Sequence, residues 1–227
     1  MIKKWTIGVD EAGRGPLAGP VAVGVVLVPT DFDWGLIPGV GDSKQVSEKN
    51  RVVIFKRAQE LQKAGQLQYK VGLVSAKIID QKGIVYAVNS AMKTALDSVL
   101  PKQDARTQKP LTPNEPSPEG GLATLKIGVD EVMVKLDGSL RAPVEFIHQE
   151  TIIKGDSKEK VIGLASIMAK VTRDQYMEKL AVTSEYKMYN FGQHKGYGTK
   201  SHREAVSQNG LSTEHRVTYC GNIEFVV

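Results

Sequence analysis

The stretch WTIGVDEAGRGPLAGPVAVGVVLV, residues 5–28, holds two apolar segments separated by a cluster of glycines and prolines. The first segment, residues 5–9, is short and rich in β-forming side chains, and it runs directly into Asp10 and Glu11. The second segment, residues 21–28, is apolar almost throughout, which is typical of a buried strand. Together they predict two strands joined by a tight connection that depends on glycine.

Helical and strand patterns alternate along the rest of the chain. Apolar residues at helical spacing predict helices over residues 47–65, 84–99, 161–171 and 201–208. Alternating apolar residues predict strands over residues 69–73, 132–136 and 150–153. Strands first, followed by alternation of strand and helix, predict an α/β fold with a mixed β-sheet flanked by helices.

We expect a main domain over residues 1–174 and a small helical or irregular C-terminal extension over residues 175–227 that packs on it. Residues 103–121 hold four of the ten prolines and almost no apolar periodicity. They predict a solvated loop and no certain domain boundary.

Composition excludes several classes of protein. Hydrophobic residues make up 41% of the chain and charged residues 24%, so the chain is neither disordered nor fibrous. No apolar run approaches the roughly 20 residues of a membrane span, and no coiled-coil seam is present. The single cysteine, Cys220, cannot form an internal disulfide. We therefore expect a cytoplasmic monomer without a membrane partner, and the net charge of +5 is a weak indication of polyanion binding.

Acidic residues follow three of the predicted strands at their C-terminal ends. They are Asp10 with Glu11, Asp137 in VMVKLDG and Asp156 in TIIKGD. Carboxylates at strand ends are held at the rim of the sheet, where ligand sites of α/β proteins concentrate. If these oxygens converge, they can hold two hard divalent cations about 3.5–4 Å apart, the arrangement used in phosphodiester hydrolysis. Mg²⁺ and Mn²⁺ both prefer oxygen ligands.

Each acid also has a structural interpretation that the sequence leaves open. Asp137-Gly138 is an ordinary hairpin dipeptide, and Asp156 followed by Glu159 fits a helix N-cap with its capping box. Asp10 and Glu11 fit a loop before a turn.

A second choice concerns Asp130, because KIGVDE repeats the GVDE of the first motif. Asp130 precedes a predicted strand, whereas Asp137 lies at the end of that strand. We therefore favour Asp137 for the acidic site and keep Asp130 as the alternative.

The segment AGRGPLAGP, residues 12–20, is neither a dinucleotide fingerprint nor a Walker loop, because its glycine spacing and its ending fit neither motif. The glycines on either side of Arg14 permit close approach of the backbone to a phosphate or sugar, with a guanidinium nearby. A simple tight turn is the alternative interpretation.

Five motifs, in order, resemble the type 2 ribonucleases H, and ribonuclease HII in particular. They are DEAGRGPLAGP (10–20), GDSKQVSEK (41–49), IIKGDSK (152–158), ASIMAKVTRD (165–174) and HKGYGTKSH (194–202). The resemblance runs from residue 5 to about residue 216. It implies a ribonuclease H-like fold for the catalytic domain. It also implies an endonuclease that cuts the RNA strand of RNA–DNA hybrids and single ribonucleotides embedded in duplex DNA. Such enzymes use Mn or Mg, two per active site, and leave 3′-hydroxyl and 5′-phosphate ends.

The resemblance also assigns roles to residues. The catalytic, metal-binding carboxylates fall on Asp10, Glu11, Asp137 and Asp156, and the substrate loop falls on Gly13, Arg14 and Gly15. The tyrosine that packs near the RNA–DNA junction falls on Tyr197, and motif membership makes Ser43 and Lys44 candidate phosphate contacts. A 2′-hydroxyl distinguishes RNA from DNA at one nucleotide, so a glycine-lined backbone can read it where side chains would block the approach.

Two other functions remain possible from the sequence. One is another two-metal nuclease of the same fold, of the junction-resolvase type. The other is a non-catalytic module that only binds hybrid duplexes, which the presence of all four acids disfavours.

Overall fold

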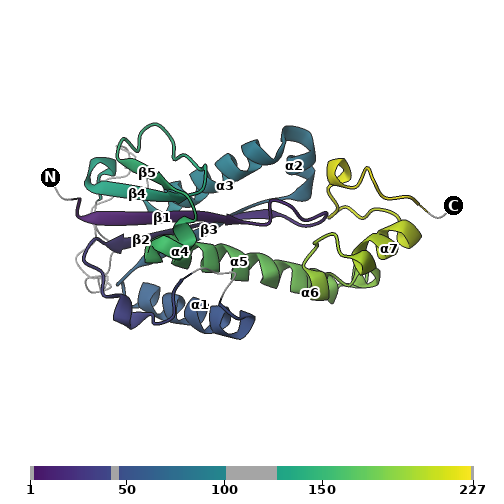
Figure 1. Cartoon of the computed structure of the whole chain (residues 1–227), viewed down its shortest axis with the longest axis horizontal. Helices are drawn as coiled ribbons and strands as arrows, with labels where there is room; N and C mark the ends of the chain where they lie inside the picture. Colours follow the sequence, from purple (N-terminus) through teal and green to yellow (C-terminus); the bar gives the residue numbers. More distant parts are fainter. Residues whose placement is uncertain (1–2, 42–45, 101–126, 226–227) are drawn as a thin grey trace, which may run out of the picture.

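The computed structural model describes residues 3–41, 46–100 and 127–225. Its centre is a five-stranded mixed sheet with the strand order β3-β2-β1-β4-β5 (Figure 1). The strands are β1 (Trp5–Ala12), β2 (Val21–Pro29), β3 (Gln68–Val74), β4 (Val132–Asp137) and β5 (Gln149–Ile152). β1, β2 and β3 pair antiparallel, whereas β4 runs parallel to β1 and β5 parallel to β4. The expected mixed sheet flanked by helices is confirmed.

Helices cover both faces of this sheet, and the last two belong to the C-terminal part. The helices of the described residues are α1 (Glu48–Lys63), α2 (Ala76–Lys82), α3 (Ile84–Val99), α4 (Gly155–Lys158), α5 (Lys160–Ala181), α6 (Phe191–His194) and α7 (Lys200–Asn209). α3 lies on one face, and α1 and α5 lie on the other (Figure 1). The side chains of each strand point alternately to the two faces, so Ile7 and Val9 pack with α3. Val26 and Val28 of β2 pack with α1 and α5.

Two glycines allow α5 to lie directly on the sheet. A Cβ atom at Gly8 of β1 would collide with the carbonyl of Val161, and one at Gly24 of β2 would collide with the carbonyl of Ala165. The strand pattern of residues 21–28 is therefore interrupted by Gly24 for a packing reason, since only glycine leaves room for the helix backbone. This contact fixes the height of α5 above the strand that carries Asp10.

A third cluster of buried side chains forms the C-terminal part of the molecule. It joins Leu17 and Ala18 of the glycine-rich loop to Met177 of α5 and to Tyr189, Phe191 and Val206. The expected boundary near residue 174 falls inside α5, whose N-terminal half packs on the sheet and whose C-terminal half packs in this cluster. The division at residue 174 therefore stays a prediction.

Most predicted elements are present, with differences at short helices. Ser47 caps α1 by accepting a hydrogen bond from the N–H of Asn50. Helix α2 is not predicted by the apolar pattern; it is short and is separated from α3 by Gly83, with φ of +81°. The predicted loop at 103–121 lies outside the described residues. Among the helices of the described ranges, none is both long and apolar enough to cross a membrane.

We expect Gly24→Ala to lower the free energy of unfolding by about 3 kcal/mol, because the backbone of α5 has to retreat from the sheet. Gly221→Ala is the matched control, since nothing lies within 4 Å of a Cβ at that position, and it should change stability by less than about 0.5 kcal/mol. Urea unfolding followed by circular dichroism measures both. Equal stability of the two variants would contradict the close contact of α5 with β2.

Candidate active site

Asp10 is a buried carboxylate near the C-terminal end of β1, with 5% of its surface exposed. It lies on the same side of the strand as Gly8, and its carboxylate bonds the Ser166 side chain of α5. Its Oδ1 also accepts a hydrogen bond of 2.7 Å from the N–H of Glu11. Burial raises the pKa of the Asp10 carboxyl well above its usual range, the negative charges of Glu11 and Asp137 raise it further, and the Ser166 bond opposes them. Asp10, Glu11 and Asp137 are therefore close enough for the charges of the other two to affect the pKa of Asp10.

Asp137 ends β4 beside Asp10. Because Val9 pairs with Leu136 in the parallel ladder, the next residue of each strand is one of these two acids. Oδ1 of Asp137 accepts a hydrogen bond of 2.6 Å from the N–H of Gly155, which immediately precedes Asp156. Asp156 is itself buried, in the first turn of α4. The turn that carries Asp156 is thus fixed to the carboxylate at the end of β4.

The structure distinguishes between the alternatives for these acids. β4 and β5 are parallel, so Asp137-Gly138 does not connect a hairpin. The N-cap of α4 is Lys154 and that of α5 is Glu159, so Asp156 caps neither helix. Asp130 lies in the short 3-10 helix η3 (Val129–Glu131), before the start of β4, and is exposed. Asp137 is therefore the acid that lies next to Asp10, at the opposite end of β4 from Asp130.

Glu11 has one carboxylate oxygen with a partner and one without. Its Oε1 accepts a hydrogen bond of 3.1 Å from Nη1 of Arg14. Its Oε2 is buried and has no hydrogen-bond partner among the described residues. A buried oxygen of this kind loses hydration without compensation, and a cation would supply the missing partner.

The acids are not arranged as a ready-made metal shell. Within the described ranges, no group of three or more His, Cys, Asp or Glu side chains is placed to hold a metal ion. Successive residues of a strand point to opposite faces, so the carboxylates of Asp10 and Glu11 approach from different sides of β1. The donor set is nevertheless all oxygen, as Mg²⁺ and Mn²⁺ prefer, and together with the unpartnered Glu11 oxygen it fits a hard divalent cation.

Two fully buried arginines hold the glycine-rich loop through its carbonyl groups. Nε of Arg216 donates to the carbonyl of Gly19 at 3.0 Å, and its two terminal nitrogens donate to the carbonyls of Arg14 at 2.9 Å and Gly13 at 2.7 Å. Arg173 of α5 donates to the carbonyls of Pro20, Ala18 and Lys195, at 2.8, 3.0 and 2.9 Å. The conformation of the Gly13-Arg14-Gly15 segment therefore depends on side chains far away in the sequence.

The two guanidiniums are charged groups without a carboxylate bonded to them among the described residues. Burial lowers the pKa of Arg216 to about 10, and the neighbouring charge of Arg173 contributes. Sequence reasoning missed both residues. Arg173 lies on the buried side of α5, between Ala169 and Met177. An arginine at helical spacing within an otherwise apolar stripe could have indicated a buried charged residue. Arg216 lies beyond the quoted motifs and has no local signal.

Tyr197 lies against the same loop with 42% of its surface exposed. The preceding residue accepts hydrogen bonds from the loop, since the N–H groups of Leu17 and Ala18 donate to the carbonyl of Gly196 at 2.9 and 3.3 Å. Nζ of Lys170 and Cζ of Arg173 both lie 5.6 Å from the centre of the Tyr197 ring. The structure therefore brings Tyr197 and the glycine-rich loop together, with the free part of the ring facing solvent.

Two buried histidines fix the backbone of Tyr197. Nδ1 of His202 lies 2.9 Å from the Tyr197 carbonyl, which can only accept, so this nitrogen carries the proton. Nε2 of His202 then accepts the hydrogen bond of 3.0 Å from Nε2 of His215. Nδ1 of His215 in turn accepts from the N–H of Ser212 at 2.9 Å. The network is complete only while both rings are neutral.

His194 stacks on His202 with ring centres 4.2 Å apart. Its Nε2 donates to the carbonyl of Tyr189 at 2.8 Å, and its Nδ1 accepts from the N–H of Gly196 at 3.2 Å. All three histidines are thus used in holding the segment that contains Tyr197. Of the remaining candidates, Ser43 and Lys44 lie outside the described residues. Lys195, which follows His194 in the chain, donates a hydrogen bond of 2.6 Å from its Nζ to the carboxylate of Glu178.

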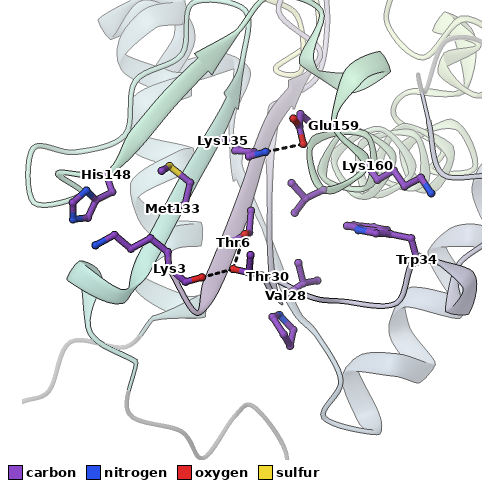
Figure 2. Close-up of a pocket in the computed structure, with 12 residues that line it drawn as sticks. Lys3, Thr6, Val28, Thr30, Trp34, Met133, Lys135, His148, Glu159 and Lys160 are labelled. Carbon is purple, nitrogen blue, oxygen red and sulfur yellow. Dashed lines mark hydrogen bonds and ion pairs between the residues drawn. The ribbon is translucent and has the colours of Figure 1, made fainter. Parts of the chain in front are cut away.

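The larger of the two described cavities, about 540 Å³, lies away from the four acids. Figure 2 shows Lys3 and His148 on one side of it and Trp34 and Lys160 on the other. Lys135 spans its upper edge through an ion pair of 2.9 Å with Glu159. Thr6 lines this cavity four residues before Asp10, so the cavity lies near the opposite end of β1 from the acids.

The histidine network predicts a loss of stability in mild acid. Burial lowers the pKa of His202 and His215 to about 4 from an ordinary value of 6.5. Between these values the unfolded chain binds more protons than the folded one. Stability present above about pH 6.5 should therefore fall as the pH drops to 4, by an amount on the order of a few kcal/mol.

Melting temperatures between pH 7.5 and pH 4 measure this effect. His202→Gln should give a shallower dependence on pH than the unmodified protein, whereas His148→Gln, outside the cluster, should keep the original slope. The same slope in all three proteins would show that the network does not carry the acid sensitivity.

The chain is similar to known proteins in both sequence and fold. A family model described as Ribonuclease HII matches residues 7–222. Ribonuclease HII of Endomicrobium trichonymphae is 39% identical over 212 residues, which are 93% of this chain and 83% of the relative.

Two solved structures share the fold. The ribonuclease H2 of Pyrococcus horikoshii OT3 superposes with a TM-score of 0.63 at 24% identity, over 97% of each chain. Bst-RNase HIII in complex with Mn²⁺ superposes with a TM-score of 0.55 at 16% identity, over 91% of this chain and 70% of that one. With the family model matched over nearly its whole length, this chain belongs to the ribonuclease HII family and is a hydrolase of the ribonuclease H class.

Proposed function

We propose that this chain cuts RNA–DNA hybrids, and single ribonucleotides embedded in duplex DNA, at the site formed by Asp10, Glu11, Asp137 and Asp156. Family membership supports the action on hybrids. The observation that most supports this site is the buried carboxylate of Asp10 beside the end of β4. At that end Asp137 accepts a hydrogen bond from the turn that contains Asp156. The acids come from β1, β4 and α4 and lie near the C-terminal ends of the central strands.

The four carboxylates would hold Mg²⁺ or Mn²⁺, two per site. Bound there, such cations supply Lewis-acid stabilisation of the phosphoryl oxygens and a lowered pKa for a bound water. The oxygen donor set and the unpartnered Oε2 of Glu11 support this assignment, as does the Mn²⁺ bound by the structural relative Bst-RNase HIII. Hydrolysis with departure of the 3′-oxygen would leave 3′-hydroxyl and 5′-phosphate ends.

The protein's own contribution begins with the electrostatics of Asp10. Its raised pKa means that the ionised carboxylate is unfavourable in the isolated chain, because it is buried beside Glu11 and Asp137. Ser166 donates to the ionised form and partly offsets this. A site of this kind is stabilised by positive charge and destabilised by its absence, which couples folding to cation binding.

Ribonucleotide recognition would use the backbone of the glycine-rich loop and the ring of Tyr197. The carbonyls of Gly13 and Arg14 are bonded to Arg216, so the loop has a fixed shape before substrate arrives. Nothing lies within 4 Å of a Cβ at Gly15, which leaves its backbone accessible to a 2′-hydroxyl. The exposed part of the Tyr197 ring would pack against the adjoining deoxynucleotide, where an additional hydroxyl would clash.

Asp10→Asn should reduce hybrid cleavage by at least about a thousand-fold while hybrid binding persists, because the shape of the site is kept and the charge is lost. The same change should raise the melting temperature of the metal-free protein, since the buried charge is removed, and should abolish the stabilisation that Mg²⁺ gives the unmodified protein.

Asp130→Asn is the matched control, and it should keep normal cleavage and normal stabilisation by Mg²⁺. Near-normal turnover by Asp10→Asn would refute the role of Asp10. Loss of activity in Asp130→Asn would restore the alternative acid.

Tyr197→Ala should slow cleavage at a single embedded ribonucleotide by about ten-fold or more, because one ring–nucleotide contact is worth roughly 1–3 kcal/mol. Tyr197→Phe keeps the ring and should remain near the original rate. The substrate panel should contain a long hybrid and a branched all-DNA duplex. Unchanged rates for Tyr197→Ala would remove this residue from the site, and preferential cleavage of the branched duplex would favour a junction resolvase.

A further inference from the structure

A second hollow of about 500 Å³ opens beside the acids, between α3 and the loop that follows β4. Arg14 reaches it from the glycine-rich loop, and Ser139, two residues after Asp137, lines its edge. Arg14 also bonds Glu11, so one side chain belongs both to the acidic site and to this hollow. The hollow and the acidic site therefore share the Arg14 side chain.

The hollow combines an apolar floor with a positively charged rim. Its floor includes the buried side chains of Val88, Met92 and Leu140, which belong to the core between α3 and the sheet. Its charged lining residues are Arg14, Lys93 and Arg141, and no aspartate or glutamate lines it. Two of these cations form ion pairs with acids outside the lining: Arg14 with Glu11 at 3.1 Å and Lys93 with Asp97 at 2.7 Å.

The wall formed by the loop after β4 has a fixed shape. Oε1 of Gln149 accepts from the N–H of Ala142 at 2.9 Å, and its Nε2 donates to the carbonyls of Ala142 at 3.3 Å and Phe146 at 3.0 Å. The Arg141 side chain is exposed immediately before this anchored segment. The anchored wall fixes the backbone that carries Arg141, so less backbone freedom is lost when an anion binds there.

We propose that this hollow, lined by Arg14, Asn89, Lys93 and Arg141, binds the sugar–phosphate backbone of the duplex next to the scissile site. Apolar surface suits the faces of the sugars, and separate cations along a rim suit successive phosphates. Asn89 adds a neutral donor and acceptor of the kind that also contacts phosphate and sugar. The inference rests on the proposed function, because it extends the nucleic acid beyond the four carboxylates.

Salt-dependent binding tests this inference directly. The parent protein is Asp10→Asn, which binds without cutting, and the probe is a fluorescent RNA–DNA hybrid measured by anisotropy from 50 to 300 mM salt. Adding Arg141→Gln should weaken binding about five-fold or more near 0.1 M salt and lower the slope of log K against log salt by about 1. The variant that carries both Arg141→Gln and Lys93→Gln should have a slope of log K against log salt about 2 lower than that of the Asp10→Asn parent.

Two further variants separate a phosphate contact from a general effect of charge. Arg141→Lys should retain the slope, because the cation is kept. Lys56→Gln removes the same charge from the exposed side of α1, on the other face of the sheet, and should leave both affinity and slope unchanged.

The outcomes are distinct. A parent-like slope in the double variant, or an equal loss in Lys56→Gln, overturns the hollow as a backbone site and leaves the proposed function standing. Failure of the Asp10→Asn parent itself to bind the hybrid overturns both. Melting temperatures of all variants confirm that each remains folded.

Discussion

The close approach of α5 to strands β1 and β2 is the constraint on which the rest of the molecule depends. It requires Gly8 and Gly24, because any side chain there would meet the backbone of the helix. The same approach buries Asp10 against Ser166 and carries Arg173, further along α5, to the carbonyls of Ala18 and Pro20. One packing contact therefore sets the position of an acid and of the loop beside it.

Negative charges lie on the side of the site formed by the strand ends, and buried positive charges lie on the side formed by the glycine-rich loop. The acids at the ends of β1 and β4 repel one another, which is part of why the pKa of Asp10 is raised. The glycine-rich loop is instead held by two buried guanidiniums that bond backbone carbonyls. Removing one such arginine would leave several buried carbonyls unpaired, a large penalty in a low-dielectric interior. The loop is consequently held in one conformation before any ligand binds.

Local pattern in the sequence was sufficient for the strands and for Asp10 and Asp137 near the ends of β1 and β4, whereas Asp156 lies in α4 and not at the end of β5. Strand alternation alone favoured Asp137 over Asp130, and β4 places Asp137 beside Asp10. Arg216 could not be found in this way, because it contacts Gly13 across 203 residues and no short-range pattern records such a contact. The histidine network was missed for the same reason, and the roles expected for Ser43 and Lys44 fall outside the described residues. Long-range packing, rather than secondary structure, is what the sequence left unspecified.

We propose that acids from separate elements form one cation-binding centre next to a loop whose shape is already fixed for a nucleotide. Crystals soaked in Mn²⁺ and measured at the manganese absorption edge test it most directly, because an anomalous difference map locates the metal without assuming its ligands. We expect anomalous peaks contacted by the carboxylates of Asp10, Glu11, Asp137 and Asp156. A peak held by Asp130, or a map with no peak near Asp10, would contradict it.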